Sequence, residues 1–341
     1  MRIDAHTHYL SEGLLESLRR RKEPPFVERA SNGTELLRSR EMTFAFTPEH
    51  YDPAVRRAFM QRVGLDAQVL SFPAGRGLDI LPGAEGVAMV RDYNDHLSAH
   101  CRAHPGEFYG VGGLPYADMQ VAAAELRRLR GSLGLVGAVV PAGFFRSEAG
   151  LDELAPVLDA AEETGACLMV HPSPRPGDVP PQKFADQAMH RVSTVELFGN
   201  LAHVMVTILC SDRLADRRNI VVHVIDLGGA GLVMYERMRQ MEAVRERRTI
   251  ARFERFGQLL FDNSSLGPRA LEMAVKVYGA DRIMLGTDYP YFPVADSVRA
   301  LEEADLTSAE REAVGSGTAC RLLSRYGLMH GSPVSQEGRA A

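Results

Sequence analysis

Cysteine is scarce in this chain, and the positions of its cysteines argue against two common kinds of stabilising site. The four residues are Cys101, Cys167, Cys210 and Cys320, and no two of them form a CxxC pair. A zinc ribbon needs paired cysteines, and a disulfide framework is typical of short secreted chains with closely spaced cysteines. The sequence therefore predicts four unpaired thiols in a reducing compartment.

An excess of positive charge is also missing. The 39 Lys and Arg residues are outnumbered by 44 Asp and Glu residues, which gives a formal net charge of −5. Nucleic acids and acidic membrane surfaces are bound mainly through clustered positive charge. The composition gives no reason to expect either partner, so a small molecule or another protein is the expected one.

Long apolar runs are absent as well. No uninterrupted apolar segment approaches the roughly 20 residues that a membrane-spanning helix needs. A predicted strand begins at residue 2, which leaves no room for a signal peptide within this sequence. The apolar content of 45% and the charged content of 24% are typical of a globular protein. We expect a cytoplasmic protein without a membrane segment.

What the sequence does contain is a regular alternation of two patterns. Short apolar runs typical of strands alternate with longer segments of helical period over most of the chain. Eight such units predict a (β/α)8 barrel of the TIM type. A doubly wound sheet is the alternative, but no GxGxxG turn opens any of the helices. The predicted strands start at residue 2 and otherwise cover 67–72, 108–114, 135–140, 166–171, 220–226, 259–264 and 282–288.

Two segments do not follow this alternation. Residues 11–62 carry turn and charge signals without a sustained period, and we expect an irregular insertion with short helices there. The last segment, GSPVSQEGRAA at 331–341, has the composition of a flexible tail. The predicted organisation is therefore a single barrel domain over residues 1–330, with an insertion after its first strand.

Polar residues cluster at the ends of the predicted strands. Barrel enzymes place their chemistry at the carboxyl ends of the strands, where side chains from different strands meet at one rim. Two or three imidazoles with a carboxylate suit a divalent zinc, manganese or iron ion with one position left open for water or substrate. Residues of metal-ligand type at these ends are His6, His8, His171, Asp226, Asp262 and Asp288.

The motifs at these strand ends carry a family resemblance. HTH in the first strand, VHP in the fifth, a Gly-Gly pair after the sixth and GTDYP in the eighth resemble the amidohydrolase superfamily. The similarity is to the branch that contains aminocarboxymuconate-semialdehyde decarboxylase and the resorcylate-type decarboxylases. It extends from strand 1 to strand 8 and is weakest over residues 11–62. The resemblance implies that one ion is held by His6, His8, His171 and Asp288.

The same resemblance implies a function. It is that of a metal-dependent decarboxylase (a lyase) or hydrolase, which acts on a small carboxylate-bearing substrate through a metal-activated water. Zinc is the expected ion, and a homodimer or a pair with a related chain is the expected assembly. Two alternatives stay open: a dinuclear iron or manganese oxygenase on the same fold, and a catalytically silent metal-binding subunit paired with an active paralogue.

The chain departs from the family pattern at the end of strand 6. Relatives usually have His-x-Gly-Gly there, with the histidine as acid/base, whereas this chain has Asp226 followed by Leu-Gly-Gly. We predict that Asp226 is catalytic, as a general base toward the metal water, or that it binds a second ion. His190 and His223 are further candidates for a second ion or a substrate contact, although strand alternation predicts that His223 faces the helix layer. We expect Asp262 to orient a neighbour by hydrogen bond.

Overall fold

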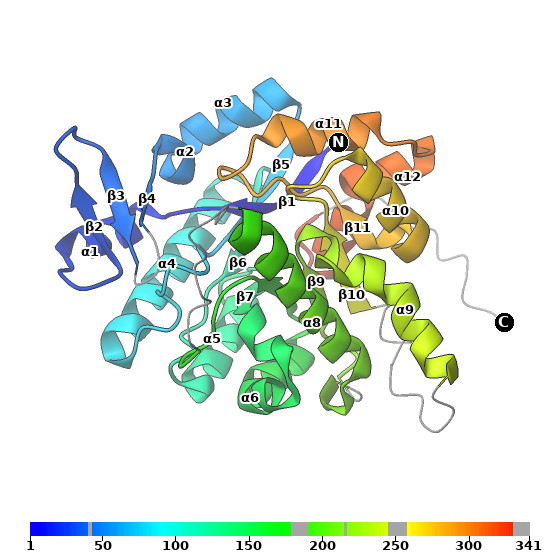
Figure 1. The fold of residues 1–341 in the computed structure, drawn as a ribbon. Helices are drawn as coiled ribbons and strands as arrows, with labels where there is room; N and C mark the ends of the chain where they lie inside the picture. The colour runs from blue at the N-terminus through cyan, green and yellow to red at the C-terminus, as the bar shows by residue number, and fades with distance from the viewer. Residues whose placement is uncertain (40–42, 179–189, 215–216, 245–257, 330–341) are drawn as a thin grey trace.

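The fold is described by a computed structural model, which covers residues 1–39, 43–178, 190–214, 217–244 and 258–329. Eight parallel strands form one sheet in sequence order, and backbone hydrogen bonds such as Ala5 N–H to Leu285 O (2.8 Å) join its first strand to the segment directly after its last strand. The predicted (β/α)8 barrel and its eight strands are confirmed (Figure 1). The strands are β1 (Ile3–His8), β5 (Ala67–Ser71), β6 (Phe108–Gly112), β7 (Gly137–Pro141), β8 (Cys167–His171), β9 (Val221–Val224), β10 (Leu259–Asp262) and β11 (Ile283–Met284).

Helices surround the strands, and local signals in the sequence define several of their ends. The Asp118 carboxylate accepts hydrogen bonds from the backbone N–H groups of Gln120 and Val121, and Gly165 ends another helix in the left-handed conformation. The helices of the barrel are α4 (Gly83–Ala103), α5 (Met119–Gly131), α6 (Glu148–Thr164), α8 (Leu197–Cys210), α9 (Gly231–Val244), α10 (Pro268–Tyr278), α11 (Val294–Glu303), α12 (Ser308–Glu312) and α13 (Thr318–Arg325). Short helical turns are η1 (Ala142–Arg146), η2 (Arg191–Glu196), η3 (Asp212–Leu214), η4 (Asp226–Gly228), η6 (Ala280–Arg282) and η7 (Ala313–Gly317).

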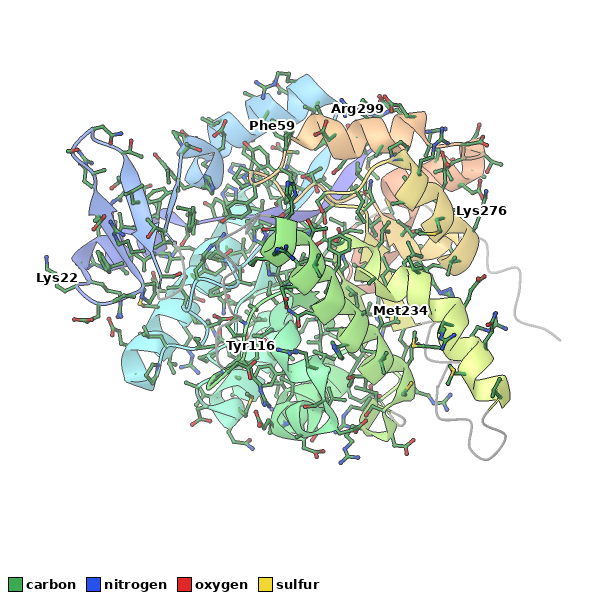
Figure 2. The ribbon with its side chains drawn as sticks, in the orientation of Figure 1. Lys22, Phe59, Tyr116, Met234, Lys276 and Arg299 are labelled. Carbon is green, nitrogen blue, oxygen red and sulfur yellow. The ribbon has the colours of Figure 1, made fainter. Side chains whose placement is uncertain are left out.

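The core lies inside the barrel and between the strands and the helices. Strands β5, β6 and β7 are buried along their whole length, as is typical of parallel strands that helices cover. Tyr116 lies in this interior, where its hydroxyl donates to Val139 O at 2.6 Å. Figure 2 shows side chains filling the space between the layers, whereas Lys22, Lys276 and Arg299 lie at the periphery.

The insertion after β1 is more regular than its sequence suggests. It contains a three-stranded antiparallel sheet whose strands are too short to show an alternating pattern. Figure 1 shows the insertion on the side of the barrel where β1 lies. Its Arg56 donates to the carbonyl of His8, its His50 accepts at its carbonyl from Leu10 N–H, and its Phe44 ring lies 6.0 Å from that of Tyr291. Its elements are α1 (Glu12–Arg20), β2 (Phe26–Arg29), β3 (Glu35–Arg38), β4 (Thr43–Ala45), α2 (Pro48–Tyr51) and α3 (Pro53–Val63). The expected tail at 331–341 lies outside the described residues.

One helix corrects the expectation that no segment is apolar enough to span a membrane. Residues Arg191–Cys210, which comprise η2 and α8, reach a mean hydropathy of 1.5 and qualify by length and composition alone. The expectation considered only uninterrupted apolar runs. This segment contains scattered polar residues but few charges, so its mean hydropathy stays high. In this structure it lies between β8 and β9, and Leu201, Val204 and Met205 are buried against the barrel. A core helix passes the same test, so the finding is weak evidence for a membrane segment.

Candidate metal centre

Four side chains converge at the end of the barrel where β1, β8 and β11 finish. His6 and His8 come from β1, His171 is the last residue of β8, and Asp288 follows β11. One ligand-type atom of each residue lies within 4.8 Å of the other three. The His8 Nε2 atom is 2.9 Å from Asp288 Oδ1, and the His6 Nε2 atom is 3.6 Å from the same oxygen. The structure therefore brings together the four residues that the resemblance implies as ligands.

Asp288 reaches this cluster through an unusual backbone conformation. Its φ of +56° lies in the left-handed region, which residues with a side chain seldom adopt outside functional sites. Its N–H donates to His6 O at 2.9 Å, and the carboxylate of Asp4 accepts hydrogen bonds from both the N–H and the hydroxyl of Thr287. These hydrogen bonds to β1, the strand of His6 and His8, hold the backbone of Asp288 beside the two histidines.

The donor set fits a divalent cation. Among the described residues, the buried atoms His6 Nε2 and His171 Nδ1 have no hydrogen-bond partner, although buried polar atoms are nearly always paired. Ligand atoms about 2.1 Å from one ion lie at most about 4.2 Å apart, so the cluster needs only a small contraction. Burial and the neighbouring His8 and His6 hold the pKa of His171 well below its usual value, which leaves this imidazole neutral and able to ligate.

A second group of polar side chains lies behind His6 and centres on Asp262 at the end of β10. Its Oδ2 atom is 3.2 Å from His6 Nδ1 and 2.7 Å from His223 Nε2. Its Oδ1 atom accepts hydrogen bonds from the hydroxyl of Ser264 at 2.5 Å and from the backbone N–H of the same residue at 3.0 Å. A carboxylate on Nδ1 turns Nε2 toward the cluster, so Asp262 orients a neighbour in the way that the sequence predicts.

Asp226 belongs to this second group, lies outside the four-residue cluster and is not among the described residues that line the adjoining cavity. It begins the turn η4 with a φ of +51°, and its Oδ1 atom accepts hydrogen bonds from the hydroxyls of Ser264 at 2.8 Å and Ser265 at 3.0 Å. Burial, together with the negative charges of Asp262 and Asp288, raises the pKa of Asp226 to about 7. Near neutral pH this carboxyl group can therefore both hold and release a proton.

The prediction that His223 faces the helix layer is wrong. His223 contacts Asp262 inside the barrel, and its ring centroid is 6.5 Å from that of His6. The prediction assumed that the strand continues regularly to Asp226. In the structure β9 ends at Val224 and Asp226 has a positive φ, so the alternation does not extend from Asp226 back to His223. Val222 takes the outer face instead and lies beside Ile208 of α8.

The role of His190 stays a prediction: this residue lies at the start of the helical segment whose Val192, Ser193 and Glu196 line the adjoining cavity. It is exposed and precedes the first residue of η2. It is not among the described residues that form the metal-type cluster or line the adjoining cavity. Within the part of the chain that the structure describes, no second group of three or more ligand-type residues has metal-binding spacing.

A cavity of about 550 Å³ adjoins the cluster, with His8, His171 and Asp288 in its wall. Arg76, in the loop after β5, also lines it and carries its guanidinium 5.0 Å from the ring centroid of Tyr291. The ring of Tyr291 is in turn 5.1 Å from that of His8. Sequence reasoning missed Arg76, although its place just beyond a predicted strand end was a usable signal.

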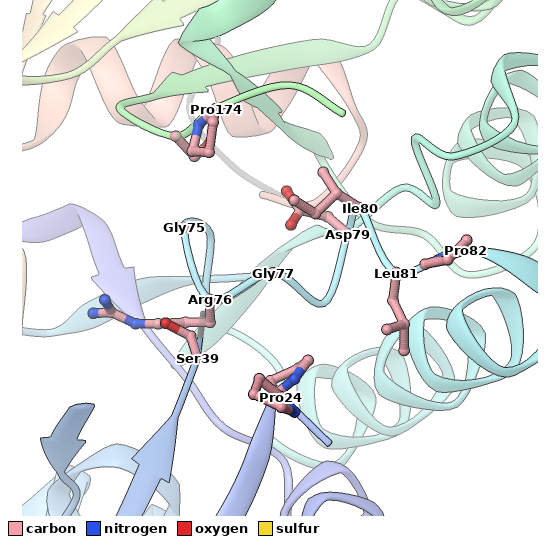
Figure 3. Close-up of a pocket in the computed structure, with 12 residues that line it drawn as sticks. Pro24, Ser39, Gly75, Arg76, Gly77, Asp79, Ile80, Leu81, Pro82 and Pro174 are labelled. Carbon is pink, nitrogen blue, oxygen red and sulfur yellow. The ribbon is translucent and has the colours of Figure 1, made fainter. Parts of the chain in front are cut away.

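A smaller pocket of about 50 Å³ lies behind Arg76 (Figure 3). Half of its lining residues are proline, isoleucine or leucine, and it shares Gly75, Arg76, Ser173 and Pro174 with the larger cavity. In Figure 3 the side chain of Arg76 points away from Asp79. Asp79 is buried in this wall, and burial raises the pKa of its carboxyl group to about 7. The pocket has room for a small substituent only.

Comparisons with known proteins point to one family. A family model described as Amidohydrolase matches residues 3–206 and 210–325. Gamma-resorcylate decarboxylase from Polaromonas sp. is 24% identical over 284 residues, which are 79% of this chain and 86% of that protein. The 2-amino-3-carboxymuconate-6-semialdehyde decarboxylase of Dictyostelium discoideum is 26% identical over 264 residues, 73% of this chain and 69% of that protein.

A solved structure agrees with the fold. The crystal structure of a dihydroxybenzoic acid decarboxylase from Polaromonas sp., determined with bound manganese, is 18% identical and has a TM-score of 0.72. The match covers 97% of this chain and 99% of that chain. At this level of identity the likeness shows the barrel fold alone.

Proposed function

Because the chain belongs to the amidohydrolase family, we propose that it is a metal-dependent decarboxylase of a small carboxylate, with hydroxylated benzoates as the first class to test. The observation that carries the proposal is the convergence of three imidazoles and one carboxylate beside a cavity of about 550 Å³. Two curated relatives that match most of this chain are decarboxylases, which favours a lyase over a hydrolase.

The proposed ligands of the ion are His6, His8, His171 and Asp288. Three nitrogens and one oxygen suit zinc, and a structural relative carries manganese, so both ions are candidates. A divalent ion held there would polarise an oxygen of the substrate as a Lewis acid. Asp262 holds the His6 ring in the required orientation, and His171 stays neutral because it is buried.

Arg76 is the residue proposed to bind the acidic group of the substrate. Its guanidinium lies 4.3 Å from the ring centroid of Phe44 and 5.0 Å from that of Tyr291, which fixes the direction of its N–H groups. A planar guanidinium binds a carboxylate through two parallel hydrogen bonds. Since Arg76 lines the same cavity as His8 and His171, a bound carboxylate lies close to the proposed ion.

Asp226 is proposed to supply the proton that decarboxylation requires. When the bond between the substrate carbon and its carboxyl carbon breaks, carbon dioxide leaves and the electron pair stays on the substrate carbon. A proton must then form a C–H bond at that carbon. In the metal-free chain burial and the neighbouring carboxylates raise the pKa of Asp226 to about 7, which makes this carboxyl group the proposed donor. Solvent returns the proton to Asp226 after each turnover.

The test uses the chain loaded with Mn²⁺ or Zn²⁺ in D2O. The first substrates are 2,6-dihydroxybenzoate and 5-carboxyvanillate, after which two decarboxylases with solved structures of the same fold are named. We expect carbon dioxide and a product with one deuterium at the carbon that lost the carboxyl group. Asp226→Asn should keep the metal and lose at least about 100-fold in turnover, the scale expected for a lost proton donor. Asp281→Asn, the same change at an exposed aspartate of η6, is the matched control.

Other results would point to the remaining alternatives. Incorporation of oxygen from water without release of carbon dioxide would replace the proposal with a hydrolase. Consumption of O2 with two iron or manganese ions per chain would replace it with an oxygenase. A metal-loaded chain that turns over nothing alone, but restores activity to a related chain, would be a silent subunit. Unchanged turnover in Asp226→Asn would remove Asp226 from the chemistry.

A further inference from the structure

The insertion contributes a fully buried arginine to the barrel. Arg56 of α3 has no exposed surface, and no carboxylate among the described residues lies within ion-pair distance of its guanidinium. Burying a guanidinium is costly unless its N–H groups are satisfied. A buried arginine without an acidic partner therefore needs a compensating set of acceptors, and the identity of those acceptors indicates its role.

Two of the four acceptors of Arg56 lie on β1, the strand that carries two proposed ligands. One terminal nitrogen donates to the hydroxyl of Thr7 at 3.2 Å, and Thr7 lies between the two histidines of β1. The other terminal nitrogen donates to the backbone carbonyl of His8 and, at 3.2 Å, to that of Glu49. Arg56 thereby fixes the backbone from which the His8 ring projects.

The same guanidinium also reaches the segment that carries Asp288. It stacks 4.8 Å from the ring centroid of Tyr289, the residue that follows Asp288, and Phe59 of the same helix stacks on that ring at 4.2 Å. His8 N–H donates to the backbone carbonyl of Tyr289 at 2.7 Å. Arg56 is thus in direct contact with both segments whose side chains meet at 2.9 Å in the cluster.

A third connection passes through Gln68 of β5. Arg56 donates to Gln68 Oε1 at 3.2 Å, and Gln68 Nε2 donates to Asp4 Oδ2 at 3.2 Å. Asp4 in turn accepts the hydrogen bond of the Thr287 hydroxyl at 2.7 Å. Asp288 is therefore flanked by two residues, Thr287 and Tyr289, that belong to one buried network with Arg56.

From these contacts we infer that Arg56 is a positioning residue of the metal centre, which sets the spacing between His8 and Asp288. The inference rests on the proposed metal site and extends it to the insertion. Holding Asp288 at a positive φ requires support from its surroundings, and Arg56 provides it on the Tyr289 side. A lysine cannot replace it, because one ammonium group cannot bond four acceptors and stack on a ring as well.

The experiment is a titration of the metal-free chain with Mn²⁺, together with urea unfolding of the same samples. Arg56→Met should weaken Mn²⁺ binding by 10- to 100-fold, the range found when a group that orients a ligand is lost. The Mn²⁺ affinity of Arg56→Lys should lie between that of Arg56→Met and that of the wild type. The control is Arg130→Met: Arg130 also stacks on a tyrosine, Tyr326 at 4.1 Å, and bonds the carbonyl of Leu135. It lies near Cys167, at the opposite end of β8 from His171, and among the described residues it has no hydrogen bond to a proposed ligand.

Arg130→Met should lower stability and leave the Mn²⁺ dissociation constant within twofold of wild type. If Arg56→Met does not fold, Gln68→Met cuts the link to Asp4 with little change in volume and should also weaken Mn²⁺ binding. Wild-type Mn²⁺ affinity in the folded Arg56 variants, or an equal loss in Arg130→Met, would overturn the inference alone. A wild-type chain that binds neither Mn²⁺ nor Zn²⁺ would overturn the proposed function and the inference with it.

Discussion

Two buried networks support the proposed ligands from opposite sides, and they differ in charge. Behind His6, on the β10 side, Asp262 and Asp226 share the hydroxyl of Ser264. Beside His8, Arg56 and Asp4 are separated by the neutral side chain of Gln68. The first network therefore brings two carboxylates close together, whereas the second places a cation among neutral acceptors.

The difference in charge teaches what each network can do. A hydroxyl has one proton, so Ser264 can donate to only one of the two carboxylates at a time, and a proton on Asp226 relieves the conflict. A guanidinium stays charged throughout the accessible pH range and cannot exchange its proton in this way. The β10 side is therefore suited to moving protons, and the Arg56 side is suited to fixing geometry.

The largest expected effect comes from removing one of the proposed metal ligands, which both networks support. His171→Ala deletes one of the four proposed ligands, so we expect Mn²⁺ and Zn²⁺ affinity to fall by more than about 100-fold, beyond the loss for a supporting residue. Elemental analysis of the purified chain measures the occupancy. Full occupancy in this variant would contradict the ligand assignment and leave the two networks without a common function.

The next largest effect is expected from a change in the network on the β10 side alone. Asp262→Asn removes the charge that holds His6 Nδ1 and His223, and should weaken Mn²⁺ binding by about 10- to 100-fold. Asp79→Asn is the matched control, because Asp79 is also a buried carboxyl group but lies in the wall of the smaller pocket of about 50 Å³. Equal losses in the two variants would mean that general destabilisation, and not the orientation of His6, explains the result.

The smallest expected effect is on the pH dependence of stability in the metal-free chain, which should differ between variants of the two networks. The pKa of Asp226 is raised from its model-compound value of 3.8 to about 7, so the folded state keeps a proton that the unfolded state releases. This group therefore costs no stability below about pH 4, an increasing amount as the pH rises from 4 to 7, and a constant amount above. Between pH 5 and pH 8 this loss of stability should be smaller by about 2–3 kcal/mol in Asp226→Asn.

Urea unfolding at pH 5 and pH 8 measures that difference. Arg56→Met should change this pH dependence less than Asp226→Asn does, because a guanidinium does not titrate in this range and reaches Asp4, whose pKa burial raises to about 7, only through Gln68. A pH dependence that changes in Arg56→Met but not in Asp226→Asn would reverse the roles given to the two networks.

Periodic patterns in the sequence were sufficient for the barrel and for most of the proposed cluster. Parallel strands buried on both faces read as short apolar runs, and their carboxyl ends must meet at one rim. The family motifs then selected His6, His8, His171 and Asp288 from the six candidates at that rim. Both kinds of information are local in the chain, which is why single segments were enough to carry them.

Tertiary structure alone decided the rest. The face of His223 depends on where β9 ends and on the positive φ of Asp226, and neither follows from a pattern of alternation. Arg56 and Arg76 come from segments without a period, and their partners lie far away in sequence, as Tyr289 does for Arg56 and Tyr291 for Arg76. The reason is physical: a side chain's role at this site is set by the atoms around it, and folding brings those atoms from strands and loops that no local pattern relates to one another.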